Sequence, residues 1–148
     1  MPHHPTDTHS TLMTAEAEAL TRQVSDMLAD LTEQYPDWTR SELVAMTDFL
    51  NRAKSTDDDE RFSLIRNDFF GKAHDIKGQG STFGYPLMTD VGAFICDYLR
   101  HKDTFTDDDI NRMQEMVDIM QTILENRLTG DGGEKGQSIR RQIGKDPQ

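Results

Sequence analysis

Apolar residues recur at intervals of three and four positions along most of this 148-residue chain. This is the period of one face of an α-helix, and no segment alternates apolar and polar residues as a half-buried strand would. Five such stripes follow one another, separated by short polar connections. Because amphipathic helices can bury their stripes only against other elements, the pattern predicts an all-α fold built as a helical bundle.

Proline, glycine and capping residues predict where these helices begin and end. Pro36 predicts the end of the first helix, because proline cannot continue the hydrogen bonding of a helix interior. Thr39 and Glu42 have the spacing of a capping box, which predicts that a second helix starts there. The other predicted boundaries are a third start after Ser55 and Thr56, a fourth start at Pro86, and a fifth helix from Thr106 to Gly130.

Large apolar residues are concentrated in residues 15–129, which we expect to form one helical domain. Residues 1–14 and 130–148 hold few of them. Segments of that composition cannot bury enough apolar surface to offset the entropy lost when the chain becomes ordered. The sequence therefore predicts a flexible N-terminal tail and a flexible C-terminal tail on either side of the domain.

The chain is strongly acidic, with 16 Lys and Arg residues against 27 Asp and Glu residues and a formal net charge of −11. This net charge argues against binding to nucleic acids or to anionic membranes, which requires a basic face. No apolar run approaches the roughly 18 residues of a membrane span, and we expect no secretory signal. The single cysteine, Cys96, excludes an internal disulfide and favours a reducing, cytoplasmic location.

One glycine-rich stretch, residues 69–86, is not explained by packing alone. Glycine inside a helix costs about 1 kcal/mol relative to alanine, so Gly71 and Gly78 in the third predicted helix require a reason. At about 100° per residue, His74 points away from the apolar stripe of this helix. Gly71, Lys77 and Gly78 are then its neighbours on the exposed face, at positions i−3, i+3 and i+4.

An exposed imidazole without bulky neighbours is suited to nucleophilic attack on phosphorus. The attacking nitrogen must be unprotonated and accessible, and an imidazole is largely neutral near pH 7. Lys77 is placed to pair with the oxygens of a transferred phosphoryl group, and Gly78 leaves room for an incoming domain. The alternative interpretation is a solvated surface histidine, beside glycines that only relieve crowding in the helix.

The segment around this histidine resembles the signature of histidine-containing phosphotransfer (HPt) domains, H-x-[LI]-K-G-x-x-x-x-[FL]-G. The matching positions are His74, Ile76, Lys77, Gly78, Phe83 and Gly84. The resemblance implies an antiparallel four-helix bundle with an additional N-terminal helix. It also implies a phosphorelay intermediate of a two-component system, in which Nε2 of His74 accepts a phosphoryl group from a receiver-domain aspartate or a sensor histidine kinase and passes it to another receiver.

The same resemblance implies a role for each neighbour of the histidine. His74 is the expected phosphorylation site, Lys77 stabilises the phosphoryl oxygens, and Gly78 keeps the imidazole accessible. The expected docking face comprises Phe70, Gly71, Lys77, Gly78 and Tyr85. We expect a monomeric phosphocarrier that is not itself an enzyme and has no ATP, cofactor or metal site, because the receiver brings its own aspartate and Mg²⁺.

Two other interpretations remain open. In the phospho-accepting hairpin of a sensor histidine kinase an acidic residue follows the histidine, as Asp75 does here, but Gly78 and Gln79 replace the expected small polar residue and proline. A helical bundle that only binds or inhibits a receiver or kinase, without being phosphorylated, is the second alternative. It leaves the combination of His74, Lys77 and Gly78 without an explanation.

Overall fold

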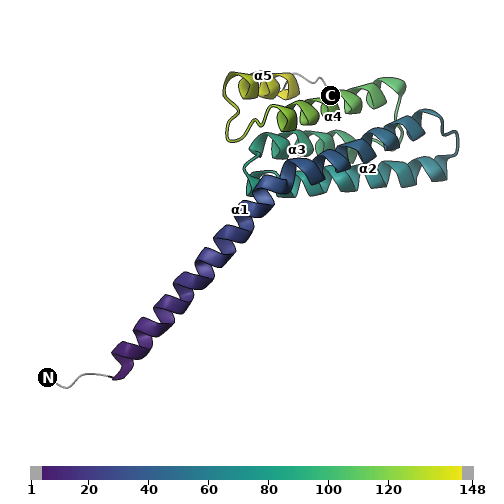
Figure 1. Ribbon diagram of the computed structural model, residues 1–148. Helices are drawn as coiled ribbons and strands as arrows, with labels where there is room; N and C mark the ends of the chain where they lie inside the picture. The colour runs from purple at the N-terminus through teal and green to yellow at the C-terminus, as the bar shows by residue number, and fades with distance from the viewer. Residues whose placement is uncertain (1–4, 145–148) are drawn as a thin grey trace. The chain divides into compact units, whose positions relative to one another are not determined.

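The computed structural model describes residues 5–144, and the side chains of residues 13–144. Over this range the protein is all-α, as the sequence predicts, and no residue within it is assigned to a strand. The elements are α1 (Pro5–Lys54), α2 (Asp59–Gln79), the 3₁₀ turn η1 (Ser81–Phe83), α3 (Pro86–Arg100), α4 (Asp107–Glu125) and α5 (Gly133–Gly144) (Figure 1). None of the helices in the described range is long and apolar enough to cross a membrane.

The chain divides into two units, residues 1–34 and residues 35–148, and α1 contributes to both. The predicted helix end at Pro36 and the predicted helix start at Thr39 are therefore wrong, because α1 continues through both positions. Proline fixes a φ angle compatible with a helix, and its cost of about 3 kcal/mol or more comes from the lost hydrogen bond and a steric clash. Tertiary packing of the residues on either side of Pro36 offsets that cost.

That packing is an aromatic cluster at the start of the second unit. The ring of Tyr35 lies 5.3 Å from the rings of both Phe83 and Tyr85, and the ring of Trp38 lies 5.2 Å from that of Phe83. Thr39 is buried as well. It lies in the middle of α1, so its side chain does not cap a helix. The contacts between these rings hold the turn around Pro36 helical.

The core of the second unit is one cluster of buried residues, to which α1, α2, α3, α4 and α5 all contribute. In Figure 1 residues 35–54 of α1 run beside α2, and α3 packs against α2, α4 and α5. The ion pair between Lys72 and Glu42 links α2 to α1. The predicted stripes are largely buried; their fully buried members include Leu43, Met46, Leu50, Phe69, Ala73, Leu87, Val91, Ile95, Met113, Val117 and Met120.

The C-terminal segment differs from the flexible tail that its composition predicts. The helix α4 ends at Glu125 rather than at Gly130, and residues Gly133–Gly144 form the further helix α5. Ile139 on α5 is buried, and the Arg140 guanidinium lies 3.3 Å from the Asp90 carboxylate on α3. Ile143 also packs against the core, and Arg112 donates a hydrogen bond of 3.4 Å to the Gln142 carbonyl oxygen. Contacts of this kind hold a segment that is polar overall. Residues 145–148, the end of the predicted tail, lie outside the described residues.

The N-terminal unit consists of the first part of α1. Helix α1 begins at Pro5, within the predicted flexible tail of residues 1–14, of which residues 1–4 lie outside the described range. The apolar stripe of this unit is exposed: Leu20 and Met27 are 61% and 64% accessible.

Candidate functional site

The helix that carries His74 is defined at its start by acidic residues. Asp58 is the N-cap, and its carboxylate accepts a hydrogen bond of 3.0 Å from the Glu60 amide. Asp59 and Glu60 follow in the first turn, where the positive end of the helix dipole favours negative charge. The helix buries a single face, formed by Ile65, Phe69, Ala73 and Ile76.

His74 lies on the opposite, exposed face of α2, as the helical period predicts. Its ring stacks loosely on the half-buried ring of Phe70, with centroids 6.3 Å apart and planes inclined by 25°. A Cβ placed at Gly71 or at Gly78 would meet no atom within 4 Å. The imidazole therefore has an aromatic support on one side and open space over the two glycine positions.

The two lysines near His74 differ in their surroundings. Lys72 forms an ion pair with Glu42 on α1. Lys77, one turn after His74, is half-buried, and its ammonium group forms no ion pair with the described residues. Its positive charge acts on Cys96 of α3: burial raises the pKa of that thiol, and Lys77 opposes the increase. Lys77 is thus a cation one turn from the exposed imidazole. Its charge also acts on the buried thiol of Cys96.

The turn of α2 that carries His74 rests directly on α3 at Gly92. A Cβ at residue 92 would lie 2.9 Å from the Lys77 amide nitrogen and 3.0 Å from the Ala73 carbonyl oxygen. Only glycine allows the two helix backbones to approach so closely. Sequence reasoning did not single out Gly92, although a glycine among buried apolar residues such as Val91 and Ile95 was the available signal.

The end of α2 is held by a second close approach. A Cβ at Gly80 would lie 2.6 Å from Thr89 Oγ1 and 2.7 Å from the Tyr85 carbonyl oxygen. The Ser81 amide donates a hydrogen bond of 2.9 Å to Thr89 Oγ1, and Gly84 adopts a φ of 87°, which favours glycine. Gly80 and Gly84 therefore shape the turn into α3, whereas Gly71 and Gly78 leave a surface bare.

Four of the five expected docking residues lie on the face of His74, and the fifth, Tyr85, does not. Gly71 and Gly78 are exposed, and Phe70 and Lys77 are half-buried on the same face as His74. Tyr85 is only 3% accessible, and its ring packs on that of Tyr35. Tyr85 therefore belongs to the core and does not contribute its ring to the exposed face, in contrast to the expectation from the sequence.

Other possible sites are separate from His74. Within the described residues, no three His, Cys, Asp or Glu side chains gather as metal ligands would. A cavity of about 380 Å³ is lined by residues near the ends of α3 and α5, among them Phe94, Tyr98 and Ile143. No residue of α2 lines it. The His74 face itself presents an exposed imidazole with open space at Gly71 and Gly78.

Comparison with known proteins identifies no relative. No family model matches the chain, and no curated protein and no solved structure matches it significantly.

Proposed function

We propose that this protein is a phosphorelay intermediate of the HPt type, in which His74 carries the phosphoryl group. The imidazole nitrogen attacks the phosphorus of a receiver-domain phosphoaspartate. A P–N bond forms, the P–O bond to the aspartate breaks, and the aspartate leaves as a carboxylate. The reverse reaction passes the group to the next receiver. The observation that carries the proposal is the exposed His74 between two glycine positions that have no neighbour within 4 Å.

Access is the first requirement of this chemistry. In-line attack brings the receiver's active site to within a few ångströms of the imidazole, so a side chain that overhangs it would block the partner. Positions i−3 and i+4 are those that would overhang it, and here they are Gly71 and Gly78. Both lie on the exposed face, where glycine only weakens the helix. A role in partner access explains why glycine is present at both positions although it weakens the helix.

Charge is the second requirement. A phosphoryl group adds about −1.5 to −2 charges at neutral pH, and the chain already has a net charge of −11. Lys77 lies one turn from His74 and is not recorded in an ion pair with any described residue, whereas Lys72 is paired with Glu42. We therefore assign to Lys77 the stabilisation of the phosphoryl oxygens. The receiver supplies the Mg²⁺.

The fold we propose for the second unit is the antiparallel four-helix bundle of HPt domains, made from residues 35–54 of α1 with α2, α3 and α4. The partners we propose are receiver domains and, as a source of phosphoryl groups, a sensor histidine kinase. The docking face is centred on His74 and includes Phe70, Gly71 and Gly78, with Tyr85 omitted. A cytoplasmic location is part of the same proposal, because these partners act there.

The decisive experiment follows the phosphoryl group. Receiver domains of the source organism are phosphorylated with a labelled small-molecule donor, purified, and incubated with the full chain. The label should move to this protein and be lost in acid, as phosphohistidine is. His74→Gln should abolish labelling while circular dichroism and the thermal midpoint stay unchanged. His101→Gln is the matched control, because His101 is also exposed but lies at the end of α3, and it should label normally.

Two results would contradict the proposal. Labelling that persists in His74→Gln would move the site elsewhere. Stable binding of a receiver to the wild-type chain, without transfer from any phosphorylated receiver, would favour a bundle that only binds or inhibits its partner.

A further inference from the structure

Exposed apolar residues are concentrated on one short stretch of α1. Eight large apolar side chains in the described residues are strongly exposed, and six of them lie between residues 13 and 31. They are Met13, Leu20, Val24, Met27, Leu28 and Leu31, with accessibilities from 41% to 64%. A single helix in water with such a face is only marginally stable, because helices in proteins depend on packing of their apolar side. This face therefore requires a partner.

The spacing of these residues specifies what kind of partner fits. Met13, Leu20 and Met27 are seven residues apart, and so are Ala17, Val24 and Leu31, which fall between them. The intervals alternate between four and three, which is the a/d pattern of a coiled coil with the first set at d and the second at a. A strict seven-residue repeat imposes a left-handed supercoil, so this face fits another helix with the same repeat.

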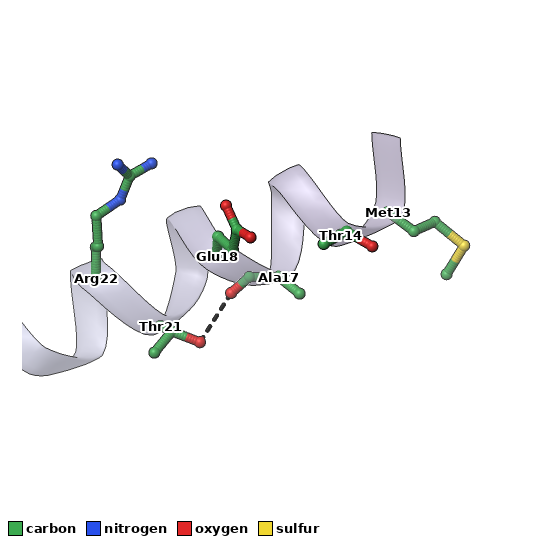
Figure 2. Close-up of a pocket in the computed structure, with 6 residues that line it drawn as sticks. All are labelled: Met13, Thr14, Ala17, Glu18, Thr21 and Arg22. Carbon is green, nitrogen blue, oxygen red and sulfur yellow. Dashed lines mark hydrogen bonds between the residues drawn. The ribbon is translucent and has the colours of Figure 1, made fainter. Parts of the chain in front are cut away.

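Figure 2 shows the N-terminal part of this face. Ala17 and Thr21 point to one side of the helix, whereas Glu18 and Arg22 point to the other. The Thr21 hydroxyl donates a hydrogen bond of 2.9 Å to the Ala17 carbonyl, so this polar group is satisfied within the helix. The charged side chains thus lie off the seam, as they do in coiled coils.

The seam has a defined end. The next d position is Gln34, which is polar and exposed. After it, Tyr35 is buried in the aromatic cluster of the second unit. The heptads therefore stop where the packing of residues 35–148 begins, and they form a separate pairing element.

We propose that this face binds the same face of a second copy of the chain, as a parallel two-stranded coiled coil formed by residues 13–34. Two copies of the chain match each other in length and register, because each has apolar a and d positions over the same residues. Val24 at an a position with Leu20 and Met27 at d favours two strands. This inference replaces the monomer expected from the sequence, and it does not depend on the proposed function.

The charges beside the seam favour the parallel orientation. The g positions are Glu16, Gln23 and Asp30, and the e positions include Thr21 and Leu28. In a parallel pair g faces e of the other chain, so Glu16 meets Thr21 and no like charges are opposed. In an antiparallel pair g faces g, which would place Glu16 against Asp30 of the other copy and cause repulsion.

The test is the mass of the full chain in solution. Analytical ultracentrifugation over a wide concentration range, at about 0.15 M salt to screen long-range repulsion, should give the dimer mass. A variant with Leu20→Glu and Met27→Glu places charges in the seam and should halve the mass. The matched control, Ala15→Glu with Ala29→Glu, adds the same charge at exposed positions off the seam and should remain a dimer. Circular dichroism checks that each variant keeps the helices of the second unit.

Orientation has its own readout. Leu20→Cys should give a disulfide-linked dimer in the presence of oxidised glutathione, because a d position faces itself in a parallel pair, whereas Ala29→Cys should not. A wild-type chain that is monomeric at every concentration would overturn the proposal and assign the face to a helix of another protein. A dimer that survives the two glutamates would also overturn it, and failure of Leu20→Cys to cross-link would overturn the parallel orientation.

Discussion

Gly92 of α3 lies against the backbone of Lys77 in α2, so closely that a Cβ at residue 92 would come to 2.9 Å from the Lys77 amide nitrogen. The Ala73 carbonyl oxygen lies at a similar distance, 3.0 Å, from the same position. Ala73 and Lys77 flank His74 on the chain. The turn that presents the imidazole is therefore held by direct contact between two helix backbones, and the packing of the core and the position of the candidate site are set by the same contact.

Gly92→Ala should consequently destabilise the protein, although alanine is the better helix former. Helix propensity favours alanine by about 1 kcal/mol, but overpacking typically costs about 1–3 kcal/mol, and here the obstructing atoms belong to backbone that cannot rotate away. We expect a net loss of about 1 kcal/mol, measured as a lower urea midpoint. Gly71→Ala, where nothing lies within 4 Å, is the control and should hold or raise the midpoint. A more stable Gly92→Ala variant would show that α2 and α3 can separate freely.

The sequence predicts the faces of the helices in the second unit better than their ends. The stripe of Ile65, Phe69, Ala73 and Ile76 is buried as its period requires, and His74 is exposed for the same reason. Periodicity is local, so it can be read without knowing the fold. The continuation of α1 through Pro36 could not be predicted, because the cost of a proline in a helix is offset here by rings that come from the distant residues Phe83 and Tyr85.

The candidate site shows the same division. The exposed positions of His74, Gly71 and Gly78 follow from their places on one helix. The burial of Tyr85, the support from Gly92 and the attachment of α5 through Ile139 depend on contacts between segments far apart in the sequence. No local pattern encodes such contacts. The sequence already sets Gly71 and Gly78 apart as exposed helix positions, but only the structure shows that Gly80 is required by the close approach of Thr89 and Tyr85.

Gly78 provides a test that separates access from stability. Gly78→Ala should hold or raise the thermal midpoint, because no atom lies within 4 Å of the added methyl group and the helix gains about 1 kcal/mol. Gly78→Gln should slow phosphoryl transfer strongly while the fold remains stable, because its side chain overhangs His74. The transfer rate is measured from a time course of phosphoryl transfer from one phosphorylated receiver. Ser63→Gln, at an exposed position near the start of the same helix, is the control and should transfer at the wild-type rate.

A wild-type rate in Gly78→Gln would mean that the receiver does not approach over this turn of α2. A slow variant that has also lost its fold would not count as support, so the thermal midpoint and the rate are measured on the same preparation.

The carboxylate of Asp109 links stability to pH. Burial acts to raise its pKa, but hydrogen bonds from Lys102 Nζ at 2.7 Å, the Tyr98 hydroxyl at 2.6 Å and the Thr106 amide at 2.9 Å outweigh burial and lower the pKa to about 2. The ordinary value is 3.8. A lowered pKa contributes stability that is present above pH 4 and is lost as the pH falls towards 2. The difference corresponds to about 2 kcal/mol.

Asp109→Asn should therefore destabilise the protein by about 2 kcal/mol at pH 7, and the gap to the wild type should narrow as the pH falls from 4 to 2. Urea midpoints at a series of pH values measure this. Asp97→Asn is the control, because Asp97 is exposed and pairs with Arg100 on the same helix; surface pairs of this kind contribute about 0–1 kcal/mol. A gap for Asp109→Asn that stays constant with pH would show that the carboxylate is not charged in this network.

Lys77 and Lys72 allow charge near the imidazole to be separated from charge elsewhere on the helix. A hydrogen bond between charged groups contributes about 1.5–3 kcal/mol, which corresponds to roughly ten- to a hundredfold in a rate or an equilibrium. If Lys77 pairs with the phosphoryl oxygens, Lys77→Ala should lower the rate or the final extent of phosphorylation within that range. Lys77→Arg should recover part of the loss, because the charge is kept while the geometry changes.

Lys72→Ala is the matched control. It removes the same charge from the same helix and breaks the ion pair with Glu42, so it should lower the urea midpoint slightly and leave transfer unchanged. Transfer kinetics from one receiver at fixed salt, measured for wild type and the three variants, compare the two positions directly. If Lys77→Ala transfers as fast and as far as the wild type, the charge of the phosphoryl group must be balanced by the Mg²⁺ and basic residues of the receiver alone. If Lys72→Ala is impaired equally, the effect is that of overall charge on an acidic chain and not of a cation placed beside His74.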